Sequence, residues 1–231
     1  MNPIGYVDRT WNPMTGCSPV SEGCRNCWAR RMAKRLAANP SVKHRKRYAN
    51  FMPTFWKERL DEPDHWRKPQ VVAVNFMGDM FHPDHPWSCT AQVFNAMRRY
   101  SQHTFLILTK RPRLAWGFLD CYWRAPAENI WIGVSAENQA AWDERVPDLL
   151  ACRAAHRWVS MEPLLELVLP APRGSGTVKG LDWIVVGRET GPGARPFQHH
   201  WKVPWRIQTA MNNISLWEKG EGRAGFQEKP F

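Results

Sequence analysis

Short apolar runs alternate along this chain with stretches whose apolar residues have helical spacing, and this alternation restricts its fold more than any other feature. The runs that predict strands are Val71–Asn75, Thr104–Leu108, Ile130–Gly133, Arg157–Ser160 and Trp183–Gly187, with weaker ones at Ile4–Asp8 and Ile214–Trp217. Helical spacing is clearest in Thr90–Tyr100 and Gln139–Leu150. Strands that alternate with helices are typical of a parallel sheet. A full eight-unit barrel needs about 250 residues, so we expect an α/β fold with a partial or near-complete parallel (β/α) barrel.

Residues 39–70 interrupt this alternation between the first predicted helix, Arg25–Ala38, and the second predicted strand. The insertion is basic and aromatic, and contains Lys43, His44, Arg45, Lys46, Arg47, Tyr48, Phe51, Phe55, Trp56, Trp66, Arg67 and Lys68. Two interpretations are open: an arm that binds nucleic acid by charge and base stacking, or a solvated loop that covers the barrel with tryptophans packed beneath it. We expect residues 1–220 to form a single barrel-like domain with this insertion, and residues 221–231 to form a flexible tail.

The charge of the chain indicates its class of partner. The chain has 231 residues, with 32 Lys and Arg against 21 Asp and Glu, which gives a net charge of +11 at pH 7. Such a surface attracts phosphate-rich molecules, so DNA or RNA is the expected partner. No apolar run has the length of a membrane span, and the N-terminus lacks the charged and apolar regions of a signal peptide. We therefore expect a cytoplasmic protein with no membrane partner and with its six cysteines reduced.

Three of the six cysteines, Cys17, Cys24 and Cys27, fall within eleven positions of a loop rich in proline and glycine. Thiolates are soft ligands that select zinc or iron–sulfur clusters. Three thiolates are one fewer than a closed zinc site or an ordinary cluster uses, so a cluster here would keep one iron open. We favour an iron–sulfur cluster, and the alternatives are a zinc site with a distant fourth ligand or three unrelated buried thiols. The isolated cysteines are expected to be small buried hydrophobes, and these are Cys89, Cys121 and Cys152.

Charged and amide side chains follow the C-terminal ends of five predicted strands. The segments that contain them are Met77–His82, Thr109–Pro112, Ser135–Asn138, Met161–Pro163 and Gly187–Pro196. The C-terminal strand ends of a parallel barrel form its active-site face, so five such segments predict a polar pocket for a zwitterionic ligand. Plainer alternatives exist for single residues, with Asn138 as a helix cap and Glu162 as the partner of a nearby arginine. The glycine-rich Gly187–Pro196 is also suited to cradling a phosphate or carboxylate with its backbone N–H groups.

Together these segments resemble the phage gene-product-37/gene-product-68 family, a domain of unknown function that is also found in bacteria and mobile elements. The matching stretches are Trp11–Gly16 with the three cysteines, Gly78–His82, Leu108–Pro112, Gly133–Asn138, Glu162–Leu165 and Gly187–Pro196. They extend from about residue 7 to residue 196. This family is usually regarded as a divergent relative of radical SAM proteins, with spore photoproduct lyase as a comparison.

The resemblance implies a radical-SAM-like barrel with a 4Fe–4S cluster on the three cysteines and S-adenosylmethionine at the open iron. Electrons would come from a reductant such as flavodoxin or ferredoxin, and cleavage of the cofactor would generate a 5′-deoxyadenosyl radical. The catalytic residues that follow from the resemblance are Asp79, Lys110, Glu137, Glu162 and Glu189. The cofactor-binding residues that follow from it are Gly78, Asp79, Lys110, Arg111, Ser135, Glu137, Asn138, Gly187 and Arg195.

Three of these roles are more specific in the resemblance. Gly78 and Asp79 would contact the methionyl amine, Lys110 or Arg111 the methionyl carboxylate, and Glu137 the ribose. The chain also departs from the usual radical SAM pattern, because six and then two residues separate its cysteines where three and two are usual. The leading hypothesis is a radical-SAM-like enzyme that acts on a nucleic acid or nucleotide. The alternative is a non-catalytic zinc or iron–sulfur nucleic-acid-binding protein of phage or mobile-element origin.

Overall fold

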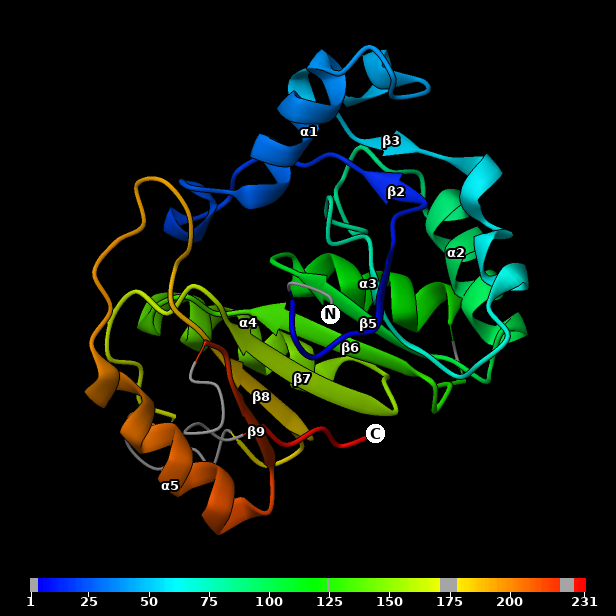
Figure 1. The fold of residues 1–231 in the computed structure, drawn as a ribbon. Helices are drawn as coiled ribbons and strands as arrows, with labels where there is room; N and C mark the ends of the chain where they lie inside the picture. The colour runs from blue at the N-terminus through cyan, green and yellow to red at the C-terminus, as the bar shows by residue number, and fades with distance from the viewer. Residues whose placement is uncertain (1–3, 124, 171–177, 221–226) are drawn as a thin grey trace.

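A seven-stranded, all-parallel sheet forms the centre of the protein, as seen in a computed structural model that describes residues 4–123, 125–170, 178–220 and 227–231. The strands are β1 (Arg9–Trp11), β4 (Val71–Val74), β5 (Thr104–Thr109), β6 (Ile130–Ser135), β7 (His156–Met161), β8 (Trp183–Val186) and β9 (Ser215–Glu218). Their spatial order is the same as their order in the chain, and the sheet curls into a half-barrel (Figure 1). The predicted α/β fold with a partial parallel barrel is therefore confirmed.

Six of the seven strands coincide with predicted apolar runs to within two residues, whereas the first does not. We expected it at Ile4–Asp8, but β1 is Arg9–Trp11. The apolar residues before β1 belong to the interior instead, because Tyr6 and Val7 pack in the aromatic core on the concave side of the sheet. Asp8 lies between this buried segment and β1, and its carboxylate accepts a 2.8 Å hydrogen bond from the N–H of Val71 at the start of β4.

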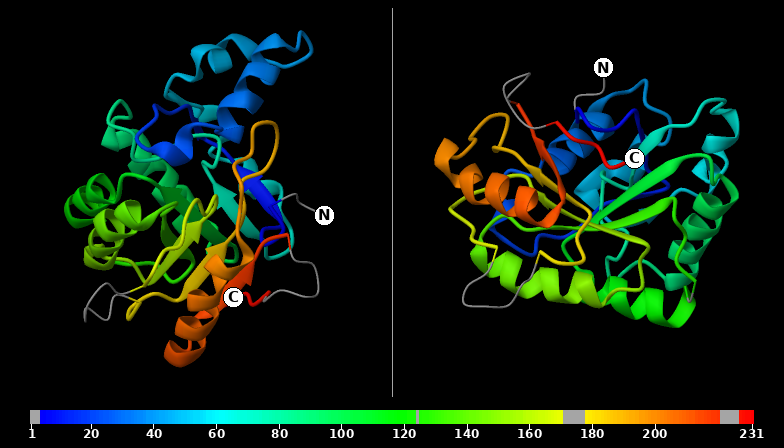
Figure 2. Two further views of the ribbon diagram at one scale, coloured as in Figure 1. Left: turned by 90° about the vertical axis from the view of Figure 1, so that its left-hand side faces the viewer. Right: turned by 90° about the horizontal axis from the view of Figure 1, so that it is seen from below.

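Helices cover the convex face of the sheet, and the described ends of the chain, near residues 4 and 231, lie on its concave face (Figure 2). The helices of the described chain are α1 (Trp28–Ala38), α2 (Trp87–Arg99), α3 (Pro112–Tyr122), α4 (Gln139–Ala151) and α5 (Val203–Asn212). Of these, α1 does not cover the sheet but packs against η2 (Arg45–Phe51). The main core lies between the sheet and α2, α3 and α4, whose apolar faces bury Phe94, Phe118 and Trp142. Within the described ranges, no helix combines the length and apolar character that crossing a membrane requires.

The concave side of the sheet is packed with aromatic rings, chiefly Tyr6, Trp158 and Trp183, with ring centroids 5.1–6.2 Å apart. Gly133 in β6 makes room for one of them, because a Cβ at that position would lie 2.3 Å from Nε1 of Trp158. Part of the predicted flexible tail, residues 221–226, lies outside the described residues. In the part that is described, the Phe231 ring packs edge-on against Trp183, whose indole N–H donates to the carbonyl of Glu228 at 3.0 Å.

The predicted insertion at residues 39–70 begins against α1 at the C-terminal side of the sheet (Figure 1), and its last residues lead back to the start of β4 at the opposite end. Its short elements are η2 (Arg45–Phe51), η3 (Lys57–Arg59), η4 (Glu62–His65) and the strand β3 (Thr54–Phe55), which pairs with β2 (Met14–Thr15). Tyr48, Phe51 and Trp56 are buried there, and the guanidinium of Arg47 lies 3.9 Å from the centroid of the Trp56 ring. These aromatic residues thus fit the interpretation of a covering loop with its rings packed beneath it, and they are not free to stack on bases.

Candidate functional site

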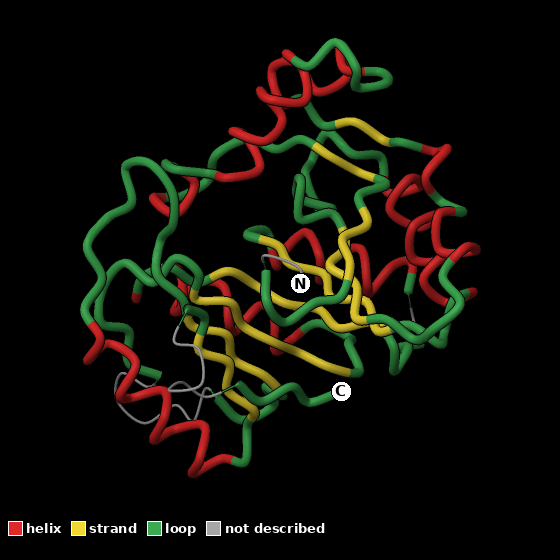
Figure 3. The backbone as a smooth tube through the Cα atoms, in the orientation of Figure 1, coloured by secondary structure: helices red, strands yellow, loops and turns green. Residues whose placement is uncertain are grey.

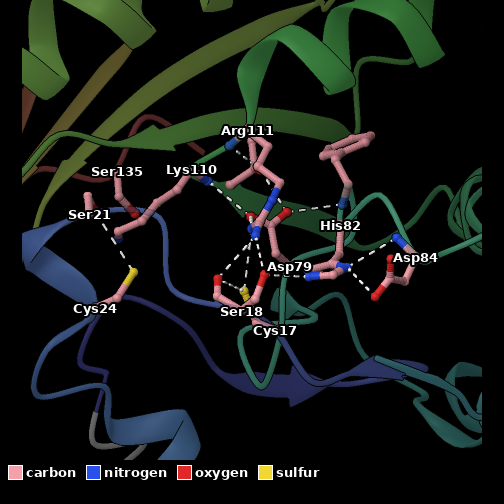
Figure 4. Close-up of polar contacts among 12 residues, drawn as sticks. Cys17, Ser18, Ser21, Cys24, Asp79, His82, Asp84, Lys110, Arg111 and Ser135 are labelled. Atoms are coloured by element: carbon pink, nitrogen blue, oxygen red, sulfur yellow. Dashed lines mark hydrogen bonds and ion pairs between the residues drawn. The ribbon is translucent and has the colours of Figure 1, made fainter. Parts of the chain in front are cut away.

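A cavity of about 680 Å³ lies between the C-terminal strand ends, the cysteine loop and α1. The three thiols of the loop line it, on Cys17, Cys24 and Cys27. Seven of the predicted catalytic or cofactor-binding residues line it as well, and these are Gly78, Asp79, Lys110, Arg111, Ser135, Glu162 and Glu189. This volume is in the range of cavities that hold small ligands or cofactors. The structure therefore gathers most of the predicted site at one cavity, and Figure 4 shows part of it.

Two glycines allow the cysteine loop to run close to the end of β4. Gly16 has a φ of +89°, and a Cβ there would lie 2.0 Å from the carbonyl oxygen of Met52. A Cβ on Gly78 would lie 2.7 Å from the carbonyl oxygen of Gly16. Because neither position has room for a side chain, the backbones meet directly, and the loop delivers Cys17 to the cavity immediately after this contact.

Cations from the end of β5 face two of the thiols. Nη1 of Arg111 lies 3.4 Å from Sγ of Cys17, whose pKa is nevertheless raised, mainly by burial and also by the charge of Asp79. Burial also acts to raise the pKa of Cys24, but hydrogen bonds from the surrounding backbone and the charge of Lys110 outweigh it and lower that pKa. The cavity wall thus offers positive charge that can compensate thiolates.

Asp79 is a buried junction beside Cys17 and Ser18 of the cysteine loop (Figure 4). Oδ1 accepts hydrogen bonds from the N–H of Phe81 at 3.0 Å and the hydroxyl of Thr109 at 2.7 Å. Oδ2 accepts from the N–H of Lys110 at 3.2 Å and from Nη1 of Arg111 at 3.0 Å. A carboxylate has about four lone-pair sites, and donors of this chain use all of them. In this arrangement Asp79 fixes Arg111 and the backbone after β5.

Glu137 supports the cysteine loop from within the protein and does not line the cavity. Its side chain is 1% exposed, and Oε2 lies 2.9 Å from Nη1 of Arg145 and 4.0 Å from Nζ of Lys110. Oε1 accepts a long hydrogen bond, 3.4 Å, from the N–H of Gly23 in the loop. Burial acts to raise the pKa of Glu137, but the charges of Lys110 and Arg145, together with hydrogen bonds from Ser21 and Arg145, outweigh it and lower that pKa. Glu137 is therefore an ionised carboxylate that joins β6, α4 and the cysteine loop.

The Gly187–Pro196 loop is fastened to the cysteine loop, and Figure 3 shows the two loops extending toward each other. Oε2 of Glu189 accepts from the side-chain amide of Asn26 at 3.0 Å and from the N–H of Arg195 at 2.8 Å. Oε1 of Glu189 accepts from Nη2 of Arg195 at 2.6 Å. Arg31 of α1 donates to the carbonyl oxygen of Thr190 at 3.2 Å. We call the three side chains Asn26, Glu189 and Arg195 the loop clasp, of which Asn26 and Glu189 line the cavity.

The loop clasp makes a prediction about acid stability. The hydrogen bonds and charge of Arg195 lower the pKa of Glu189 to about 2. A depressed carboxyl pKa adds stability above the unfolded pKa, and this stability is lost as the pH falls through the folded pKa. We therefore expect Glu189→Gln to lower the free energy of unfolding by about 2 kcal/mol near pH 7, with the difference shrinking as the pH falls from about 5 toward 2. Urea denaturation across this pH range measures it, and a difference that does not vary with pH would contradict it.

The remaining predicted residues have varied positions. Glu162 forms an ion pair with Lys219, at the end of β9. Its partner is thus a lysine, and not the nearby arginine that was the alternative expected from the sequence. Asn138 caps α4, because its Oδ1 accepts a 2.9 Å hydrogen bond from the N–H of Ala141. Gly187 bonds through its backbone to Met161 and does not line the cavity.

Several residues of the site were not anticipated as such. Among those that line the cavity are Asn26, Trp28, Ser160 and Lys219. Lys219 follows a strand end like the predicted residues, and extending that rule to the last strand would have found it. The prediction of three buried isolated cysteines is correct for Cys152, whose pKa burial raises to about 12, and wrong for Cys121, which is exposed at the C-terminal end of α3. Cys89 is partly buried.

Fold and site together define a parallel α/β half-barrel protein with a cysteine-lined cavity at the C-terminal ends of its strands. The family described as protein of unknown function (DUF5131) matches residues 1–229, and the chain belongs to this family. Neither the curated proteins nor the solved structures include a significant match to the chain.

Proposed function

We propose that this chain is an enzyme that holds a 4Fe–4S cluster on Cys17, Cys24 and Cys27 and uses S-adenosylmethionine in radical chemistry on a nucleic acid or nucleotide. The observation that carries the proposal is the meeting of three thiols from one loop with the strand-end side chains at a single cavity. The resemblance of these segments to the gene-product-37/gene-product-68 family, with its relation to radical SAM proteins, supports the choice of cluster and cofactor.

The donor set suits a cluster better than a single metal ion. Among the residues that the structure describes, no three His, Cys, Asp or Glu side chains converge closely enough to hold one ion. A cluster presents separate iron atoms to separate thiolates, so its ligands need not meet at one point. The three thiols line one cavity, and the resemblance to a family related to radical SAM proteins is what favours the cluster over the zinc alternative.

The charges on the cavity wall favour an anionic or zwitterionic ligand. Three carboxylates line the cavity, and each has a cation of the chain as its partner: Asp79 with Arg111, Glu162 with Lys219, and Glu189 with Arg195. Arg188 also lines the cavity and has no ion-pair partner in the described part of the chain. Nζ of Lys110 is held only loosely, 4.0 Å from Glu137. These two cations are suited to a carboxylate of the cofactor and to the negative charge of a thiolate-bound cluster.

Each part of the site then has a task. When bound, the reduced cluster supplies the electron that cleaves S-adenosylmethionine. Asp79 holds Arg111 in place beside Cys17, and Lys110 binds the methionyl carboxylate. Ser135 and Ser160 lie on paired positions of β6 and β7, line the cavity and are suited to hydrogen bonds with hydroxyl groups of the ligand. The loop clasp holds two loops together beside the cavity.

Anaerobic reconstitution with iron and sulfide, followed by reduction in the presence of S-adenosylmethionine, tests the proposal. We expect a brown protein that releases 5′-deoxyadenosine, and no product when the reductant is omitted. Lys110→Ala should weaken cofactor binding by calorimetry, whereas the exposed Arg67→Ala, at the opposite end of the sheet, should not. A coloured protein that forms no 5′-deoxyadenosine would contradict the radical chemistry. A colourless protein with about one zinc per chain would favour the zinc alternative.

A further inference from the structure

Residues 23–57, which we call the basic lobe, contain most of the net charge of the chain. They include ten Lys and Arg residues and no Asp or Glu. The other 22 Lys and Arg nearly balance the 21 Asp and Glu found in the rest of the chain. The basic lobe comprises α1, η2 and β3 with their connections, and Figure 1 shows it projecting beyond the C-terminal edge of the sheet. The charge of this protein is therefore concentrated beside its cavity.

The cations of α1 are arranged with like charges next to each other. Arg30 and Lys34 are four residues apart, and so are Arg31 and Arg35, which puts four cations on adjoining rows of one helix face. Like charges at this spacing destabilise a helix. No carboxylate within the lobe offsets them, so a polyanion outside the protein is the natural complement of this face.

Most cations of the basic lobe are available to such a ligand. Within the described residues, the lobe forms carboxylate ion pairs through Arg25 and Arg47, with Glu22 and Glu58 as the partners. The exposed cations that remain are Lys34, Arg35, Lys43, Arg45, Lys46 and Lys57. A surface of this kind binds phosphates of a nucleic acid backbone and gains free energy from the counterions that are released.

Trp28 adds an aromatic platform at the point where the basic lobe meets the cavity. It is the first residue of α1, it follows Cys27 directly and it lines the cavity. Its side chain is 45% exposed, whereas Tyr48, Phe51 and Trp56 of the same lobe are at most 7% exposed. Exposed rings beside a basic surface stack on bases whose faces are free, as in single strands.

We propose that the basic lobe binds the phosphate backbone of a single-stranded nucleic acid and that Trp28 stacks on one of its bases at the edge of the cavity. This inference rests on the proposed function and specifies it, because it names the form of the substrate and where it docks. A base on Trp28 lies beside the cysteine loop, so the neighbouring nucleotide is placed to enter the cavity. In a duplex, the faces of the bases are covered by the neighbouring base pairs. A duplex would therefore bind through its phosphates to the cations of the basic lobe and would not stack on Trp28.

Charge variants of the full chain test the binding of the phosphate backbone. Fluorescence anisotropy with a labelled oligothymidylate of about 12 nucleotides measures affinity at several salt concentrations. The lobe variant replaces Lys34, Arg35, Lys43 and Lys46 by Gln. The matched control replaces Arg67, Lys68, Arg153 and Lys179 by Gln, which removes the same charge from the opposite end of the sheet. We expect the affinity of the lobe variant to fall about tenfold or more at about 100 mM salt, and its salt dependence to become shallower by about 0.7 for each phosphate that the variant no longer neutralises. The control should lose much less affinity, and equal losses in both variants would overturn the proposal.

A second pair of variants tests the aromatic platform. Trp28 and Trp116 of α3 are 45% and 44% exposed, and Trp116 does not line the cavity. We expect Trp28→Ala to weaken oligothymidylate binding about tenfold, Trp28→Phe to retain most of the affinity, and Trp116→Ala to leave it unchanged. Tighter binding to a duplex of the same length, or to vesicles of anionic lipid, would overturn the single-strand assignment.

The two proposals fail in different ways. Oligonucleotide binding is measured without turnover, both before and after reconstitution of the cluster. A protein that forms 5′-deoxyadenosine but does not bind the oligonucleotide contradicts the docking proposal alone. A protein whose binding depends on the basic lobe and Trp28, but which never forms 5′-deoxyadenosine, supports the docking surface and contradicts the proposed radical chemistry.

Discussion

Simultaneous replacement of Cys17, Cys24 and Cys27 by alanine is expected to reduce the iron and sulfide bound after anaerobic reconstitution from about four of each per chain to background. The three thiols line the cavity, and Arg111 and Lys110 face two of them. With all three removed, no thiol of the described residues lines the cavity. Chemical assays of iron and sulfide, together with the visible absorbance of the protein, measure the effect.

The other three cysteines provide a matched control. Cys89 and Cys121 lie on α2 and α3, and Cys152 follows α4, all on the helical side of the sheet. Replacing them together by alanine removes the same number of thiols, and we expect the brown colour and the iron content to persist. Far-ultraviolet circular dichroism checks that both triple variants are folded. Equal loss of iron in the two variants would argue against a cluster on the loop.

A second large effect is expected for Arg145→Met, which should lower the free energy of unfolding by about 3–5 kcal/mol. Arg145 is 3% exposed, and its Nη1 donates to Oε2 of Glu137 at 2.9 Å and to the carbonyl oxygen of Ser135 at 2.8 Å. The variant leaves the carboxylate of Glu137 buried without its closest cation. Urea denaturation near neutral pH measures the loss.

Two further variants distinguish the effect of leaving a buried charge unpaired from the effect of losing a charge at the surface. The double variant Glu137→Leu with Arg145→Met should recover most of the stability, because replacing both partners of a buried ion pair is often neutral. Arg153→Met breaks a surface pair with Asp120, in which the side chains are 56% and 46% exposed, and should cost less than about 1 kcal/mol. If Arg145→Met lowers the free energy of unfolding no more than Arg153→Met does, then Arg145 does not stabilise the buried carboxylate of Glu137.

The central strands could be predicted because strands buried on both faces appear in the sequence as continuous apolar runs. β6 is the clearest example, since all six of its residues are buried. β1 could not be predicted in this way, because two of its three residues, Arg9 and Thr10, are exposed. The apolar residues that stood out instead, Tyr6 and Val7, are buried by the concave core without forming a sheet ladder.

The sequence allowed us to predict which residues gather at the candidate site, but not which of their side chains contact one another. Parallel strands bring their C-terminal ends to one edge, so the residues after each strand were predictable neighbours. Which side chains pair there depends on loop paths that no local pattern encodes. Glu189 meets Asn26 across 163 positions of the chain. Asp79, predicted to contact the cofactor, uses its carboxylate to hold Arg111 and the backbone after β5.

The loop clasp has a consequence for the biosynthesis of this protein. The cysteine loop is made early, but the Glu189 and Arg195 that hold Asn26 emerge from the ribosome much later. At about 5–20 residues per second, the 163 positions between Asn26 and Glu189 take roughly 10–30 s to translate. During that interval the three thiols are attached to a nascent chain without the last strands of the half-barrel. If the loop holds the proposed cluster, its insertion is therefore a late event, and the three thiols are exposed to oxidation and to competing metals until synthesis is almost complete.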